Sequence, residues 1–115
     1  MTLDPLTLNE YQAVAKTTAR YPTPPGMTLG YPILGLAGEA GELANCYKKV
    51  LRDDQGKLSD EKAKQLALEL GDCLWYVAAV AGDLGLSLED VARRNLDKLL
   101  GRTQRGTIQG QGEGR

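Results

Sequence analysis

The chain has 115 residues and a formal net charge of -1 at pH 7, which is the size of one ordinary domain. The near-neutral charge disfavours binding of nucleic acid by broad electrostatics, since such binding needs a basic face. No stretch approaches the roughly 20 apolar residues that span a bilayer, and no apolar segment follows a basic start. We therefore expect a cytoplasmic protein that binds neither a membrane nor nucleic acid.

Four stretches have the apolar spacing of amphipathic helices. They cover about residues 7–20, 33–51, 59–84 and 88–100. Thr7 with Glu10, and Ser87 with Asp90, have the spacing of helix-start caps, and Gly101 is expected to end the last helix. The sequence predicts an all-α domain of four helices over residues 1–102, followed by a flexible glycine-rich tail at 103–115.

The second and third predicted helices each carry an acidic pair. Glu39 and Glu42 stand one turn apart in an apolar stretch, and Glu69 and Asp72 repeat that spacing. The rest of residues 66–80 is nearly all apolar, which predicts a buried helix. Pairs at i and i+3 point into one volume, and helices packed about 8–10 Å apart can bring two pairs together. Four buried charges then need a cation or protons to neutralise them.

The ligand chemistry restricts which cation such a site would hold. Carboxylate oxygens select a hard ion, Mg²⁺ or Mn²⁺. The chain has no histidine, which excludes Ser-His and Cys-His mechanisms and a di-iron site built on Glu-x-x-His. Acidic helix faces are often only solvated or paired with lysines, and from the residues alone this alternative stays open.

Small residues in the second helix are also unusual. Gly35, Gly38 and Gly41 each cost about 1 kcal/mol relative to alanine in a helix interior. Their presence suggests close approach of another helix or of substrate. Cys46 and Cys73 lack the spacing of a zinc site and are interpreted as small buried hydrophobic residues.

The ordered set of motifs resembles a known family. The segments GLAGEAGEL at 35–43, ELGDCLWY at 69–76 and NLDKLLGR at 95–102 are similar to the MazG-like all-α nucleotide pyrophosphohydrolases of the small bacterial and phage type. That family is marked by ExxE, then ExxD, then a downstream Asn/Lys/Arg segment. The resemblance implies Mg²⁺-dependent hydrolysis of a nucleoside triphosphate between its α and β phosphates, releasing a monophosphate and pyrophosphate.

The resemblance also implies roles for individual residues. The metal ligands and catalytic acids would be Glu39, Glu42, Glu69 and Asp72. The substrate contacts would be Lys49, Tyr76, Asn95, Lys98 and Arg102. The last three share one face of the fourth helix, although Lys98 and Arg102 also suit a helix C-terminus for electrostatic reasons alone. The general base is not assigned, with a weak preference for Glu42.

Relatives of this fold form dimers or tetramers with active sites near subunit contacts, so we expect a homodimer or homotetramer. The main alternative is a catalytically silent helical module that keeps the fold for nucleotide binding or assembly. No motif indicates which base or sugar is preferred.

Overall fold

The computed structural model describes residues 4–23, 25–26 and 28–105. These residues form four helices and no strand: α1 (Leu8–Lys16), α2 (Gly30–Asp53), α3 (Asp60–Asp83) and α4 (Leu88–Arg105). The predicted all-α class and the number of helices are confirmed. Most of the predicted tail, residues 106–115, lies outside the described residues.

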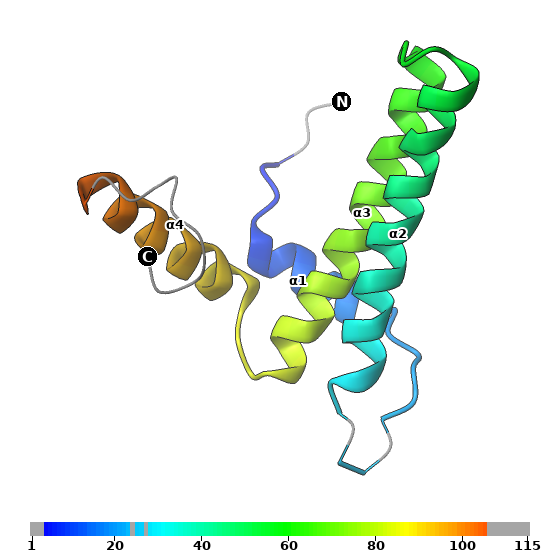
Figure 1. Cartoon of the computed structure of the whole chain (residues 1–115). Helices are drawn as coiled ribbons and strands as arrows, with labels where there is room; N and C mark the ends of the chain where they lie inside the picture. The colour runs from blue at the N-terminus through cyan, green and yellow to red at the C-terminus, as the bar shows by residue number, and fades with distance from the viewer. Residues whose placement is uncertain (1–3, 24, 27, 106–115) are drawn as a thin grey trace.

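The long helices α2 and α3 form an antiparallel hairpin and lie side by side along their length (Figure 1). Between them the chain reverses through Gln55 and Gly56, whose φ angles of 55° and 77° lie in the left-handed region. Ser59 then caps α3 by accepting a hydrogen bond from the Lys62 backbone N–H at 3.2 Å. This register sets which residues of the two helices face each other.

The first helix is shorter than predicted, ending at Lys16 instead of near Arg20. The hydroxyls of Thr17 and Thr18 donate to the carbonyls of Val14 and Ala15 at 2.6 Å. Such bonds let side chains compete with the backbone for its own acceptors. The segment that follows is thereby free to turn toward the start of α2.

The other helix ends also differ from the predicted ones. Helix α2 begins at Gly30, three residues early, because Pro32 fits within a first turn, where a backbone N–H is not needed. Helix α4 continues through Gly101 to Arg105. The prediction that this glycine ends the helix is wrong, since one helical glycine costs only about 1 kcal/mol.

Side chains of α1 fix the junction between α3 and α4. The Gln12 Oε1 atom accepts a hydrogen bond from the Leu88 N–H at 2.9 Å, and its Nε2 donates to the carbonyl of Leu86 at 3.1 Å. The Asn9 Oδ1 atom accepts from the Glu89 N–H at 3.1 Å. Two side chains from one helix therefore cap the beginning of another, and α4 leads away from the α2–α3 hairpin (Figure 1).

The core of the single chain is small. Its buried apolar residues include Val50 and Leu88, whereas Leu68 and Leu70 in the middle of α3 are 73% and 56% exposed. The prediction of a buried central α3 is therefore wrong for the isolated chain, because α2 and α1 cover only part of its circumference. Among the described residues, none of the helices combines the length and apolar character needed to span a bilayer.

Candidate metal centre

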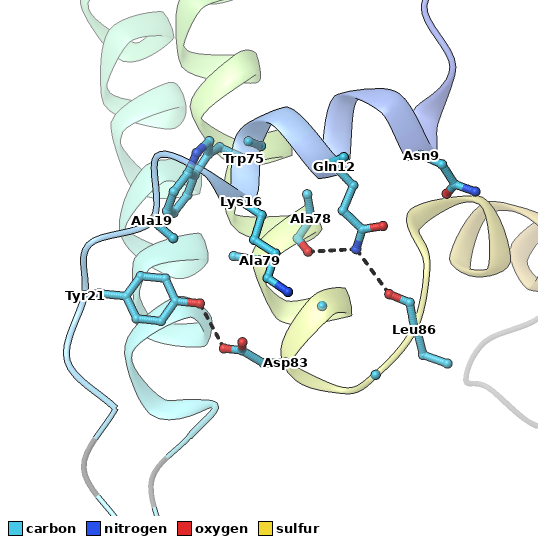
Figure 2. Close-up of a pocket in the computed structure, with 14 residues that line it drawn as sticks. Asn9, Gln12, Lys16, Ala19, Tyr21, Trp75, Ala78, Ala79, Asp83 and Leu86 are labelled. Atoms are coloured by element: carbon cyan, nitrogen blue, oxygen red, sulfur yellow. Dashed lines mark hydrogen bonds between the residues drawn. The ribbon is translucent and has the colours of Figure 1, made fainter.

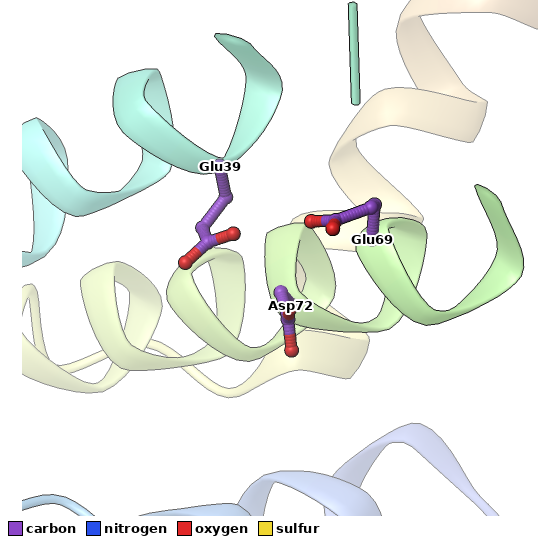
Figure 3. A group of neighbouring side chains, drawn as sticks. All are labelled: Glu39, Glu69 and Asp72. Atoms are coloured by element: carbon purple, nitrogen blue, oxygen red, sulfur yellow. The ribbon is translucent and has the colours of Figure 1, made fainter. Parts of the chain in front are cut away.

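Three acidic side chains meet across the hairpin. Glu39 extends from α2 toward Glu69 and Asp72 on α3 (Figure 3). Each contributes a carboxylate oxygen, and these oxygens lie within 4.8 Å of one another. The i, i+3 spacing puts the two α3 acids on one face, and the antiparallel packing of α2 brings the third to them. The predicted meeting of the two acidic helices is seen for these three residues.

Among the described residues, the ion pairs do not balance the charge of the cluster. The ion pairs seen among the described residues join Arg52 to Asp53 and Arg93 to Glu89, and neither includes an acid of the cluster. Partial burial, followed by the negative charges of Asp72, Glu69 and Glu42, raises the pKa of the Glu39 carboxyl. The ion pairs seen among the described residues therefore give no support to the alternative that lysines neutralise these acids.

The oxygens fit a shared cation. Ligands on opposite sides of Mg²⁺ are separated by about 4.2 Å, twice the metal–oxygen distance of about 2.1 Å. The observed limit of 4.8 Å needs only small side-chain adjustments to reach such a separation. A divalent cation would also remove the repulsion that raises the pKa of Glu39.

The fourth predicted ligand, Glu42, lies outside the group of three oxygens. Its side chain is exposed on α2. It is nevertheless close enough that its charge contributes to the raised pKa of Glu39. Glu42 therefore borders the cluster from the side of the next helical turn.

The Tyr76 ring lies beside the cluster and packs closely on α2. A Cβ atom added at Gly35 would overlap this ring, so the glycine provides the space that the ring occupies. Burial raises the pKa of the Tyr76 hydroxyl, and the neighbouring Tyr31 and Glu39 raise it further. Apart from the backbone of α2 itself and the adjacent residues, no atom of the described residues lies within 4 Å of a Cβ placed at Gly38 or Gly41. The predicted close approach is therefore seen at Gly35, whereas Gly38 and Gly41 face open space in this chain.

The downstream substrate contacts predicted from the sequence lie on α4, which packs against α3 and α1. Helix α4 carries Asn95, Lys98 and Arg102, and it has no close backbone contact with α2 in the described residues. Arg102 is only 3% exposed, and its Nε and Nη2 atoms lack a hydrogen-bond partner in that part of the chain. Within the described residues of this protomer, α4 therefore does not contact the helix that carries Glu39.

Lys49 also lies apart from the three acids. It is exposed near the end of α2, where its charge is one of the smaller contributions, after hydrogen bonding from Arg52, that lower the pKa of Asp53. Lys49 shares a helical face with Glu42 but follows it by about two turns. Lying on the same face therefore does not bring Lys49 to the cluster.

Tyr11 of α1 lies near the cluster, which the sequence does not predict. Burial, and then the charge of Asp72, raises the pKa of the Tyr11 hydroxyl, which places this α1 side chain near the acids. In the sequence Tyr11 belongs to the apolar stripe of the first helix and looks like an ordinary core residue. Only the crossing of α1 over α3 reveals the proximity.

Comparison with known proteins agrees with this architecture. A family model described as the MazG nucleotide pyrophosphohydrolase domain matches residues 31–107, which include all three clustered acids. The "Gene 37 protein" of Mycobacterium phage L5 is 47% identical over 109 residues, covering 91% of this chain and 96% of that protein. No solved structure matches. With the motifs, the helical fold and the family match in agreement, this chain belongs to the MazG nucleotide pyrophosphohydrolase family.

Proposed function

We propose that the protein hydrolyses ribo- or deoxyribonucleoside triphosphates to the monophosphate and pyrophosphate, with Mg²⁺ as cofactor and Mn²⁺ as a possible substitute. The observation that carries this proposal is the cluster of Glu39, Glu69 and Asp72, which has no neutralising partner among the described residues. Family membership supports the reaction class. The biological role would be removal of unwanted nucleotides or control of the nucleotide pool.

The three clustered acids would hold the metal ion. When bound, a divalent cation neutralises phosphate charge and lowers the pKa of water. Glu42, beside the cluster but outside its ligand oxygens, would accept a proton from the attacking water. The water oxygen forms a bond to the α phosphorus, the bond from that phosphorus to the bridging oxygen breaks, and pyrophosphate leaves.

The phosphate contacts would come from a second copy of the chain. Within the described residues of one protomer, α4 has no backbone contact with α2, so a second copy would bring Asn95, Lys98 and Arg102 to a substrate held between α2 and α3. Arg102 is an anion-binding group, and two of its guanidinium nitrogens have no hydrogen-bond partner among the described residues. A homodimer or homotetramer would place α4 of one copy beside the cluster of another.

Exposed leucines support such an assembly. On α2, Leu34 is 73% exposed and Leu51 is 56% exposed, in addition to the exposed leucines of α3. Apolar surface of this extent on one hairpin is more typical of an interface between subunits than of a monomer surface. Sedimentation at micromolar concentration should therefore show a dimer or tetramer, and a monomer alone would contradict this part of the proposal.

A screen for pyrophosphate release tests the reaction. Ribo- and deoxyribonucleoside triphosphates are incubated with the protein with and without Mg²⁺, and we expect metal-dependent turnover of at least one of them. The variant Glu39→Gln should lose this turnover. The matched control Glu61→Gln changes an exposed acid in the first turn of α3 and should keep it.

The screen also separates the enzyme from the alternative of a silent helical module. Absence of Mg²⁺-dependent turnover on every triphosphate would leave nucleotide binding or assembly as the function. Equal loss in Glu39→Gln and Glu61→Gln would show that the acidic cluster is not the reacting centre.

A further inference from the structure

A cavity of about 350 Å³ lies between α1 and the C-terminal half of α3, at the junction with α4 (Figure 2). Sites for small ligands have volumes of about 300–1,000 Å³, so this cavity is large enough for one small molecule. Glu39, Glu69 and Asp72 are not among its lining residues. The cavity is therefore a separate feature from the acidic cluster.

The walls of the cavity suit a flat ring. Small side chains leave the space open, namely those of Ala13, Ala15, Ala19, Ala78 and Ala79. The rings of Trp75 and Tyr21 stand at one end, with centroids 6.2 Å apart and planes at 81°. Tyr31 stacks on one face of Tyr21, with ring centroids 5.0 Å apart, so a planar heteroaromatic group would pack on the ring surface that this contact leaves open.

Most polar groups around the cavity are already engaged. Gln12 uses its oxygen for Leu88 and its amide for the carbonyls of Ala78 and Leu86. The indole N–H of Trp75 donates to the Thr18 hydroxyl at 2.8 Å. These hydrogen bonds fix the walls of the cavity. Other side chains must therefore provide the polar contacts to a ligand.

Two opposite charges remain available to a ligand. The Asp83 Oδ2 atom accepts the Tyr21 hydroxyl at 2.9 Å, while Oδ1 has no hydrogen bond among the described residues. Lys16 lines the same cavity and makes no ion pair within that part of the chain. Figure 2 shows both side chains extending into the space between α1 and the end of α3. A ligand that has an N–H edge and an anionic group can satisfy both.

We propose that this cavity binds a nucleoside monophosphate with a guanine base. An ionised carboxylate only accepts hydrogen bonds, so Asp83 selects a base edge with two neighbouring donors. Guanine has such an edge in its ring N–H and its 2-amino group. Adenine and cytosine present a donor next to an acceptor, and uracil presents one donor between two acceptors. The Lys16 ammonium then meets the phosphate, while Trp75 and Tyr21 contact the base.

This site goes beyond the proposed reaction, because its residues are distinct from those of the acidic cluster and its occupancy needs no metal. It is tested on the full chain in the presence of EDTA, so that hydrolysis does not contribute. GMP, AMP, CMP, UMP and guanosine are titrated by calorimetry and by fluorescence. Trp75 is the single tryptophan of the chain, so its fluorescence reports on the cavity.

We expect GMP to bind about tenfold more tightly than AMP or UMP, as a bidentate contact provides roughly 1–3 kcal/mol of discrimination between bases. Asp83→Asn should remove the preference for GMP, because an amide offers one donor and one acceptor, which match an edge of guanine, adenine and cytosine alike. Lys16→Met should weaken GMP to the affinity of guanosine while leaving guanosine unchanged. The control Lys64→Met, on the exposed part of α3, should change neither.

Equal affinities of GMP and UMP would overturn the proposal, as would the absence of binding by any monophosphate. Loss of GMP binding in Asp72→Asn, with retention in Asp83→Asn, would locate the nucleotide at the acidic cluster instead. If Asp83→Asn loses its helical circular dichroism, the proposal is tested with Lys16→Met instead. A GMP affinity that stays above the guanosine affinity in Lys16→Met would then contradict the proposal. Failure of the pyrophosphate-release screen would not affect this result, since binding here is measured without metal.

Discussion

Two regions of α3 differ in whether their polar groups have partners. At the junction with α1 and α4, each polar atom of Gln12 has a partner, and the backbone N–H groups of Leu88 and Glu89 are capped. In the middle of the hairpin, three carboxylates face one another without an ion-paired partner among the described residues. The first region is a hydrogen-bonded structural joint, whereas the second is a group of like charges without an ion-paired partner among the described residues.

The difference separates stability from function. Satisfied hydrogen bonds lower the free energy of the folded chain, so substitutions at the junction should affect folding. Like charges held close together raise it, so substitutions in the cluster should impair function and leave folding intact or improved. Experiments that measure both quantities can test whether the two regions differ in this way.

The largest expected effect is the loss of function in Asp72→Asn. Removing one charge should decrease Mg²⁺-dependent turnover by about 100-fold or more, as for removal of other groups that stabilise charge in a reaction. The same variant should keep its helical circular dichroism and melt at the same or a higher temperature in EDTA, because repulsion with Glu39 is relieved.

If Asp72→Asn unfolded the chain, the proposed difference between a functional cluster and a structural junction would be wrong. Such a result would mean that the carboxylate supports the fold and that the cluster is a structural element. Mg²⁺ provides a second measurement, since it should raise the melting temperature of the unsubstituted protein more than that of Asp72→Asn.

The next effect concerns stability at the junction. Gln12→Met keeps the length of the side chain but leaves the Leu88 N–H and the Leu86 carbonyl without their partners. We expect a loss of about 2 kcal/mol in the free energy of unfolding, since each unsatisfied group costs about 1–3 kcal/mol when buried and these are only partly buried. Urea denaturation measures it.

Asn9→Ala is the matched variant, because it removes a single exposed cap from the Glu89 N–H. Its expected cost is about 1 kcal/mol, typical of a helix N-cap. If both variants were as stable as the unsubstituted chain, the junction would not be the structural joint described above.

These two regions were not equally predictable from the sequence. The acidic cluster follows in part from local spacing, because an i, i+3 pair such as Glu69 and Asp72 shares one helix face, whereas the packing that leaves Glu42 outside the cluster is not encoded locally. The Gln12 contacts join residues 66 to 76 positions apart in the chain, and no local pattern encodes such bonds. Helix existence was therefore predictable, while the direction of α4 was not.

The exposure of α3 shows a second limit of the sequence. Its apolar residues predict burial, and the isolated chain leaves Leu68 and Leu70 largely exposed. Apolar composition indicates that a surface is to be covered, but it does not say whether the same chain or a second copy covers it. The same ambiguity applies to Gly38, which the sequence marks as a close contact and which faces open space in this protomer.

Two glycine substitutions in α2 should have smaller effects on stability. In Gly35→Ala the new methyl group would overlap the Tyr76 ring, so the ring must shift. We expect a loss of about 1–2 kcal/mol in stability, as is common when a packed site is overfilled. Displacement of Tyr76 should also weaken substrate binding, which would appear as a raised KM.

Gly38→Ala is the control for this substitution. Its methyl group meets no atom within 4 Å in the chain, so the higher helix propensity of alanine should add about 0.5–1 kcal/mol of stability. A loss of stability in Gly38→Ala would instead reveal a close subunit contact at that turn, which sedimentation of the same variant would test.

The smallest expected effect is a pH dependence of stability that comes from the cluster. The Glu39 pKa is higher in the folded chain than in the unfolded chain, because of burial and the nearby negative charges of Asp72 and Glu69. The folded chain therefore binds the proton more tightly, and this contribution to stability is present below the ordinary carboxyl pKa and is lost as the pH rises through the folded value. Thermal melts in EDTA should show this loss, Glu39→Gln should remove it, and Mg²⁺ should offset it by neutralising the cluster. If the pH dependence of stability persists unchanged in Glu39→Gln, it comes from other titratable groups. The proposed difference between the acidic cluster and the hydrogen-bonded junction would then be weakened.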